Sequence, residues 1–351
     1  MQSKEEQLFI ELIKAKEKKE SYKNIDWQKF IELCYYHRVN SFIYQKLDKK
    51  IVPKKELEKM QENNRQTALI NLFLNKEMVS FFGELKKRKI NVIALKGMAL
   101  NYVLYSKEFS RVSSDIDFLI RKKNYFEIKE VLEKKGFASS SYGMVNGGPF
   151  TQHYPGMRKK INGITCLFEP HKTLFFPVNL FSIDLEEIWR DSQEINGISI
   201  PGNEDTIIIA VLSAIYQHDF HGIFESLLDV KNMLSKEINY KKLREKTIKY
   251  NLVEPMVYFN ELFRELFEKE MQGIKELEKN ADKKKLAYLR KNPLQKIIKI
   301  KTPFSAKLER IKSRFYWTKG IKQKIKAFFF VLVLPCIWLI KNTVLPEAKK
   351  K

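Results

Sequence analysis

The feature that constrains this chain most is a pair of carboxylates at the start of an apolar segment. Residues 115–120 are Asp-Ile-Asp-Phe-Leu-Ile, and branched and aromatic side chains of this kind are typical of a buried β-strand. Residues i and i+2 of a strand share a face, so Asp115 and Asp117 are expected to point the same way, roughly 6–7 Å apart. Two like charges at the mouth of a buried strand are costly to keep ionised unless cations neutralise them. Carboxylate oxygens suit Mg²⁺, although Asp-x-Asp alone also fits a solvated strand start.

A glycine turn upstream of the aspartates carries a candidate phosphate contact. Residues 89–95 have the composition of a short buried strand, which ends at Lys96-Gly97 before helical spacing resumes. Such a turn lets backbone N–H groups and the helix dipole face an anion closely, with Lys96 as an added positive charge. A plain strand-to-helix turn explains these two residues equally well. The polar connection that follows adds Arg111 and Ser114, which fit either a phosphate contact or ordinary loop positions.

A second predicted strand, over residues 164–171, supplies a third carboxylate. It ends in Glu169-Pro-His171. Glu169 is the natural third metal ligand or general base for the aspartate pair. His171 shares its face of the strand provided that Pro170 leaves the strand geometry intact.

One helix is predicted between these two strands. Residues 124–135 have helical spacing of apolar side chains, and Gly136 fits the residue that follows many helix ends. The inward-facing side chains are predicted to be Phe126, Val131 and Leu132.

Periodicity and composition divide the chain into four segments. The first is helical and is interrupted at Pro53, because proline in a helix interior removes a hydrogen bond and clashes with the preceding turn. An α/β core, a second helical region and a basic tail follow. The predicted boundaries are 1–85, 86–203, 204–290 and 291–351.

The positive charge of the chain is concentrated in its tail. The formal net charge is +23, and from residue 281 onward 20 Lys and Arg stand against 3 Asp and Glu. The apolar run 327–340 would extend about 21 Å as a helix, short of the ~30 Å hydrocarbon core of a bilayer. An interfacial segment on an anionic membrane and a terminal core helix with a basic outer face explain it equally well. Nucleic acid is a third partner for the basic surface, although no recognised reading module accompanies it.

The three cysteines indicate the cellular setting. They are widely separated and have no metal-ligand spacing, and the N-terminus lacks a basic region followed by an apolar run. Both observations predict a cytoplasmic protein, associated with the inner face of the membrane if the tail binds lipid.

Two histidines follow an apolar helical stretch in the second half. His218 and His221 flank Asp219, but their spacing is loose and no further ligand pair is evident, which favours packing positions over a zinc site. His218 is, with His171, a candidate for lining an acceptor pocket.

Taken together, several short motifs resemble the uncharacterised nucleotidyltransferase family of the DNA polymerase beta-like superfamily. The similarity starts near Trp27 and continues into the second half of the chain, where His218 and residues 227–230 take part. The motifs are Leu95-Lys-Gly97, Leu104-Tyr105, Arg111, Asp115-Ile-Asp117, Gly136-Phe137 and Glu169-Pro-His171.

The resemblance implies an α+β fold in which a small mixed sheet is accompanied by N-terminal helices and a C-terminal helical domain. It places Gly97 beside a triphosphate, Asp115 and Asp117 on the metals, and Glu169 as the third carboxylate. The sequence departs from the superfamily pattern at Met98, where serine is usual, and in the spacing of Asp115, which follows Gly97 by 18 residues.

The predicted function is therefore transfer of a nucleoside monophosphate from an NTP, with two Mg²⁺ or Mn²⁺ ions and release of pyrophosphate. The acceptor is a small molecule, a sugar or a protein. Two alternatives remain. One is an Asp-x-Asp glycosyltransferase, which would release a nucleoside diphosphate, and the other is a non-catalytic membrane-associated binding protein with the same fold.

Overall fold

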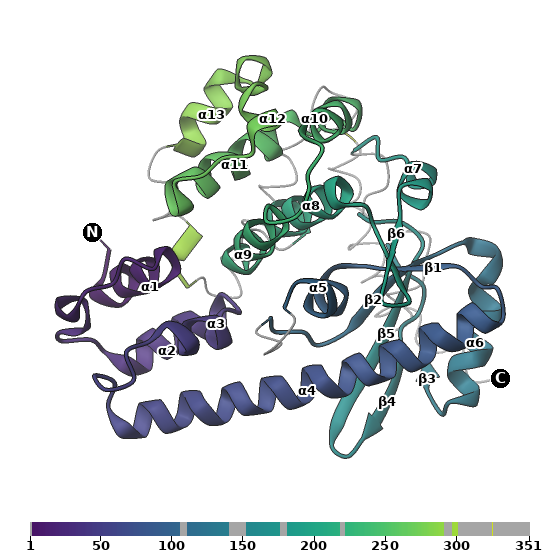
Figure 1. The fold of residues 1–351 in the computed structure, drawn as a ribbon, viewed down its shortest axis with the longest axis horizontal. Helices are drawn as coiled ribbons and strands as arrows, with labels where there is room; N and C mark the ends of the chain where they lie inside the picture. The colour runs from purple at the N-terminus through teal and green to yellow at the C-terminus, as the bar shows by residue number, and fades with distance from the viewer. Residues whose placement is uncertain are drawn as a thin grey trace, which may run out of the picture.

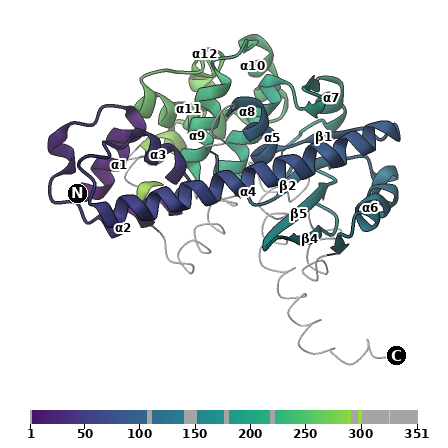
Figure 2. The same cartoon turned by 60° about the horizontal axis from the view of Figure 1, so that its bottom comes forward.

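The N-terminal helices lead into one long helix. The computed structural model describes residues 2–105, 111–139, 152–175, 181–217, 222–290, 297–300 and 325. Its first elements are helix α1 (Lys4–Lys14), the short 3₁₀ helix η1 (Lys19–Tyr22), α2 (Trp27–Tyr36), α3 (Asn40–Lys46) and α4 (Lys54–Lys87). Helix α4 starts directly after Pro53, so the predicted break is present. It spans from the N-terminal helices to the sheet (Figures 1 and 2).

A five-stranded mixed sheet forms the centre of the α/β core, as predicted. The strand order is β1 (Val92–Ala94), β2 (Ile116–Ile120), β5 (Ile164–His171), β4 (Met157–Ile161) and β3 (Ala138–Ser139). Strands β2 and β5 are parallel, and the other neighbours are antiparallel. The strand predicted over 164–171 is confirmed, and helix α5 (Lys96–Leu104) follows β1 directly.

The sheet separates two apolar layers. On one face, Ile116, Phe118 and Phe168 pack against α4 and against α6 (Tyr125–Lys134), which follows the 3₁₀ helix η2 (Lys122–Asn124). The rings of Phe118 and Phe168 are 6.1 Å apart between centroids. Because side chains alternate along a strand, Asp117 points to the opposite face, toward the C-terminal helices.

The predicted inward face of α6 is partly wrong. Val131 and Leu132 are buried, but Phe126 is 78% exposed. The buried stripe consists of Ile128, Val131 and Leu132, at i, i+3 and i+4, and Phe126 is two residues from its start, on the other side of the helix.

The remaining elements include a hairpin and a helical assembly. Helix α7 (Leu185–Arg190) precedes the hairpin β6 (Gln193–Ile195) and β7 (Ile198–Ile200), whose Asn196-Gly197 turn has two positive φ angles, as type I′ turns require. The helical assembly comprises α8 (Asn203–Leu212), a π-helical turn (Ser213–Gln217), α9 (Ile223–Met233), α10 (Tyr240–Lys249), α11 (Val253–Phe267), α12 (Gln272–Lys275), η5 (Glu278–Asn280) and α13 (Lys283–Arg290).

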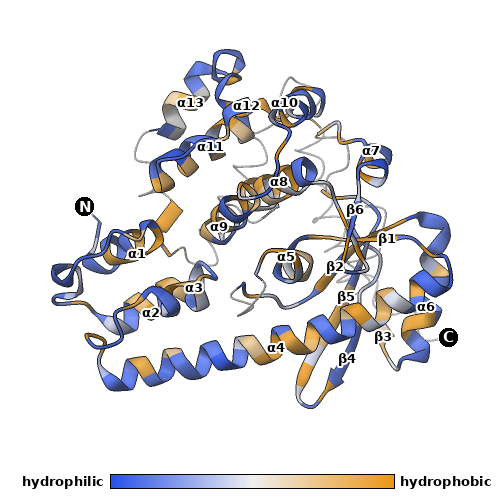
Figure 3. Cartoon of the chain, viewed as in Figure 1, coloured by the Kyte–Doolittle hydropathy of each residue, from blue (hydrophilic) through white to orange (hydrophobic). Residues whose placement is uncertain are grey.

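The N-terminal and C-terminal helices share one apolar core. Phe9 of α1 contacts Phe224 of α9, with ring centroids 5.0 Å apart, and nearly all of α8 is buried, in keeping with its apolar colouring in Figure 3. The predicted boundary between residues 85 and 86 falls inside α4. His218, His221 and the apolar run 327–340 lie outside the described residues. Among the helices that the structure describes, none is long and apolar enough to cross a bilayer.

Candidate active site

The sheet brings two of the predicted carboxylates into direct register. Asp117 on β2 is paired with Glu169 on the parallel strand β5, so both side chains lie on the same face. Asp115 directly precedes β2 and shares this face, as its i and i+2 relation to Asp117 predicts. The three carboxylates therefore meet on one face of the sheet, on two neighbouring interior strands, although Glu169 is far from the aspartates in sequence.

His171 joins this group because Pro170 does not interrupt β5. Pro170 stays in register with Phe118, and its carbonyl accepts a hydrogen bond from the Tyr154 N–H. The His171 Nε2 atom lies 2.7 Å from Asp117 Oδ1, and its Nδ1 atom lies 3.3 Å from the Thr173 carbonyl. The Asp117 carboxylate and the Thr173 carbonyl are both hydrogen-bond acceptors, and the two contacts hold the imidazole ring in place. The buried ring fixes the orientation of the Asp117 carboxylate.

The pKa values of these three carboxyl groups are shifted in opposite directions by their surroundings. Burial, followed by the charges of Asp117 and Asp115, raises the pKa of Glu169 to about 8. Burial and the charge of Asp117 raise the pKa of Asp115 to about 6. Burial alone would raise the pKa of Asp117 as well, but Lys96 and His171 lower it below its usual range. The site thus holds one firmly ionised carboxylate between two that retain protons more strongly.

The same residues have the chemistry of a divalent metal site. Asp117, Glu169 and His171 each offer a ligand atom, and these atoms all lie within 4.8 Å of one another. Carboxylate oxygens suit Mg²⁺ and Mn²⁺, and an added cation would relieve the repulsion that raises the pKa of Glu169. Asp115 is outside this tight group but on the same face. The residues present therefore fit the metal that the resemblance implies.

Lys96 and Gly97 form the start of α5 beside the carboxylates. The helix begins at Lys96, two residues before the helical spacing predicted from the sequence. Lys96 has a φ of 48°, a left-handed conformation that is uncommon outside glycine. A Cβ atom on Gly97 would lie 3.3 Å from both the Arg111 guanidinium and Ser113 Oγ, so glycine permits this close approach.

Arg111 is buried in an ion-pair network. Its Nε atom lies 3.0 and 3.1 Å from the two carboxylate oxygens of Asp229, and a terminal nitrogen lies 3.3 Å from Glu225. Asp229 also accepts a 2.8 Å hydrogen bond from the Tyr105 hydroxyl. The Arg111 carbonyl accepts hydrogen bonds from Asn71 and Asn101. The segment that precedes Asp115 is thereby fixed to helix α9.

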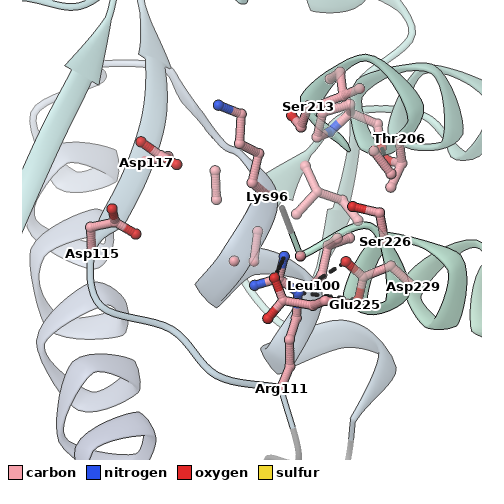
Figure 4. A pocket seen from close by; sticks show the side chains of 18 of the residues that line it. Lys96, Leu100, Arg111, Asp115, Asp117, Thr206, Ser213, Glu225, Ser226 and Asp229 are labelled. Carbon is pink, nitrogen blue, oxygen red and sulfur yellow. Dashed lines mark hydrogen bonds and ion pairs between the residues drawn. The ribbon is translucent and has the colours of Figure 1, made fainter. Parts of the chain in front are cut away.

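A cavity of about 370 Å³ connects these groups. Asp115 and Asp117 line one side, and residues of α8, the π-helical turn and α9 line the other (Figure 4). Glu169, which is paired with Asp117 in the sheet, also lines the cavity. Lys96 lies between the two sides (Figure 4). Of the residues predicted at the nucleotide, Lys96, Gly97 and Arg111 line the cavity, whereas Ser114 is exposed and is absent from the described lining.

Arg38 is the lining residue that the sequence least suggested. It is in the turn between α2 and α3, has a φ of 58°, and donates a 2.9 Å hydrogen bond to the Val112 carbonyl. Its Nε atom lies 3.6 Å from Glu225, and its side chain is 32% exposed. No local motif marks it, because its place in the cavity depends on packing between distant segments. Asp229 had a weaker signal, as an acidic residue within the apolar segment 227–230.

A known protein family matches the greater part of this chain. A family model described as "Uncharacterised nucleotidyltransferase" matches residues 23–268. Among solved structures, the chain is similar to an antigenic nucleotidyltransferase-like protein from Paracoccidioides brasiliensis. The identity is 16% and the TM-score 0.35, and the match covers 56% of this chain and 97% of that one. No curated protein matches the chain.

Proposed function

The chain belongs to the uncharacterised nucleotidyltransferase family, and on this premise we propose that it transfers a nucleoside monophosphate from an NTP to an acceptor hydroxyl group, releasing pyrophosphate. The observation that carries the proposal is the register of Asp117 with Glu169 on neighbouring parallel strands, at the edge of a cavity that also contains Asp115 and Lys96. Three carboxylates and a lysine around one cavity provide the charges that phosphoryl transfer requires.

Asp115, Asp117 and Glu169 would hold the divalent ions, Mg²⁺ or Mn²⁺. When bound, these ions supply positive charge that neutralises the triphosphate and the departing pyrophosphate. His171 keeps the Asp117 carboxylate in one orientation through its 2.7 Å contact. The acceptor oxygen attacks the α-phosphorus, the bond to the pyrophosphate oxygen breaks, and the hydroxyl proton passes to a carboxylate. Glu169 is placed to receive it, because its carboxylate lies beside Asp117 and lines the cavity.

The phosphates are proposed to contact Lys96 and the backbone N–H groups at the start of α5. Arg38 is the more accessible of the two cavity arginines, and we assign it a phosphate contact as well. Arg111 is already bonded to Asp229 and Glu225, so we propose that it positions the segment before Asp115. The contacts predicted for Ser114 and His218 remain predictions, as does the acceptor role of His171.

The direct test replaces one carboxylate. Asp117→Asn is expected to abolish NTP-dependent labelling of an acceptor with little change in thermal unfolding, because the exchange removes charge but little volume. Glu62→Gln, on the exposed side of α4, is the matched control and should keep full activity. Full activity of Asp117→Asn would refute the proposal.

The two alternatives are separated by their products. A glycosyltransferase releases a nucleoside diphosphate, so detection of pyrophosphate in stoichiometric amount with the labelled product supports nucleotidyl transfer. A non-catalytic binding protein releases neither, even when it binds Mg²⁺ and NTP in calorimetry.

The cytoplasmic setting and the membrane contact of the tail remain part of the proposal. Cys34 and Cys166 are free and buried, in keeping with a reducing compartment. Flotation of the full chain with anionic vesicles, compared with a chain ending at Gly320, tests the tail. Loss of flotation on truncation is expected, and equal behaviour would exclude a membrane role for residues 321–351.

A further inference from the structure

The side of the cavity opposite the carboxylates has a distinct chemistry. Its lining residues come from α8, the π-helical turn and α9, and they combine hydroxyl groups with apolar side chains. Thr206, Ser213 and Ser226 lie on this side, across from Asp115 and Asp117 (Figure 4). Ile209 and Ala210 of α8 add apolar surface. A π-helical turn at Ser213 is notable because such turns are frequent at functional sites.

Two polar atoms on this side have no hydrogen-bond partner among the described residues. They are Ser213 Oγ and Glu225 Oε1, each on a residue that is 7% exposed. Buried polar groups are almost always paired, so a serine hydroxyl and a carboxylate oxygen that lack protein partners at one cavity are suited to bind a polar ligand there. A serine hydroxyl rotates readily between staggered positions, and it both donates and accepts. A ligand that carries hydroxyl groups can satisfy both atoms.

The charge of the cavity argues against an anionic acceptor. Five carboxylates line it, those of Asp115, Asp117, Glu169, Glu225 and Asp229. Only three cations stand against them within the described lining, those of Arg38, Lys96 and Arg111. Two of these cations already pair with Glu225 and Asp229. Beside Ser213 and Ser226, an anionic acceptor would therefore lie against Glu225 and Asp229, whose partner cations are already engaged.

We propose that the acceptor is an uncharged, polyhydroxylated molecule, a neutral sugar or polyol, bound against Ser213 and Ser226. The inference rests on the proposed function, because it names the acceptor of that reaction. A sugar ring has an apolar face for Ile209 and Ala210 and hydroxyl groups for the two serines. One of its hydroxyl oxygens forms the bond to the α-phosphorus, the bond between that phosphorus and pyrophosphate breaks, and the hydroxyl proton is taken up by Glu169. An anionic polymer such as nucleic acid does not fit this side of the cavity.

The first test identifies the chemistry of the product. The full chain is incubated with α-labelled NTP, Mg²⁺ and a cell extract that ion exchange has separated into a neutral small-molecule fraction, an anionic small-molecule fraction and nucleic acid. Label is expected in the neutral fraction, and periodate treatment of that fraction before the reaction should prevent labelling. Preferential labelling of the anionic fraction or of nucleic acid would overturn the inference while preserving nucleotidyl transfer. Absence of label from every fraction would instead refute the proposed function, and the inference with it.

The second test locates the binding site of the acceptor. With the acceptor purified from the neutral fraction, Ser213→Ala and Ser226→Ala are each expected to raise its KM about fivefold to tenfold, which is the effect of losing one hydrogen bond. The KM for NTP should stay within about twofold. Ser235→Ala, at an exposed serine just beyond α9, is the matched control and should change neither constant.

Thermal unfolding of each serine variant separates lost binding from lost folding. If Ser213→Ala unfolds at a lower temperature than the unmodified protein, the acceptor KM of Ser226→Ala still tests where the acceptor binds. An unchanged acceptor KM in a folded Ser226→Ala, or equal increases in both KM values, would overturn the placement of the acceptor against this wall.

Discussion

Asp229→Asn removes the charged partner of the buried Arg111 guanidinium. The side chains of Arg111 and Asp229 are 9% and 1% exposed, and Nε lies 3.0 and 3.1 Å from the two carboxylate oxygens. Removing one partner of a buried ion pair costs about 3–5 kcal/mol, because the remaining charge is left without compensation. Glu225 stays within 3.3 Å of the same guanidinium, so we expect the lower end of this range, about 3 kcal/mol of unfolding free energy.

Urea denaturation measures this cost, and an exposed pair provides the control. Arg121 and Glu186 form a 2.6 Å ion pair in which the side chains are 39% and 69% exposed. Solvent screens such a pair, so Glu186→Gln should cost less than about 1 kcal/mol. A cost below about 1 kcal/mol for Asp229→Asn would refute the view that the buried ion pair stabilises the contact between the Arg111 segment and helix α9.

The same variant separates two roles of Arg111. If Arg111 positions the segment before Asp115, then Arg111→Met and Asp229→Asn should slow nucleotidyl transfer to a similar extent. Neither variant should then change the affinity for NTP appreciably from that of the unmodified protein. If Arg111 binds phosphate directly, as the sequence predicted, only Arg111→Met should weaken NTP binding. Calorimetric titration with NTP and Mg²⁺ distinguishes the two results.

Three further predictions follow from the cavity. Arg38→Ala should weaken the binding of NTP about tenfold and the binding of the corresponding nucleoside much less. Arg65→Ala, at an exposed arginine, is the control. Equal losses of affinity for NTP and nucleoside would exclude a phosphate contact. Because the pKa of Glu169 is raised from 4.5 to about 8, the metal-free protein should lose stability as the pH rises from the first value to the second. Over the same pH range Mn²⁺ binding should tighten, and above about pH 8 it should no longer depend on pH. Glu169→Gln should flatten both pH profiles, as measured by calorimetry. Gly97→Ala should lower the midpoint of thermal unfolding by a few degrees, because the new methyl group meets Arg111 and Ser113 at 3.3 Å, and an unchanged midpoint would show that the contact relaxes freely.

Local geometry made much of the site predictable. In a strand, the relation between i and i+2 places Asp115 with Asp117, and Glu169 with His171, on one face without any knowledge of the partner strands. The strand at 164–171 and the glycine turn at residues 96–97 were likewise evident from composition and spacing. These predictions depend on the period of the backbone, which the sequence carries directly.

The helix α6 shows where local patterns fail. Phe126 is apolar and close to the helix start, so it was assigned to the inward face, but only tertiary packing decides which stripe of a helix is covered. The stripe that packs against the sheet begins at Ile128, and Phe126 is left exposed.

By itself, the sequence determined three of the strands, the turn after the first of them, the family resemblance and the carboxylate pairs, because each depends on residues a few positions apart. The tertiary structure decided which pairs meet. Asp117 and His171, 54 residues apart, are joined by the register of two parallel strands, and Arg111 and Asp229, 118 residues apart, by the packing of α9. It also brought Arg38 from the N-terminal helices into the cavity. Contacts between residues so far apart in sequence depend on how whole helices and strands bury their apolar faces against one another, and no short stretch of sequence determines that packing.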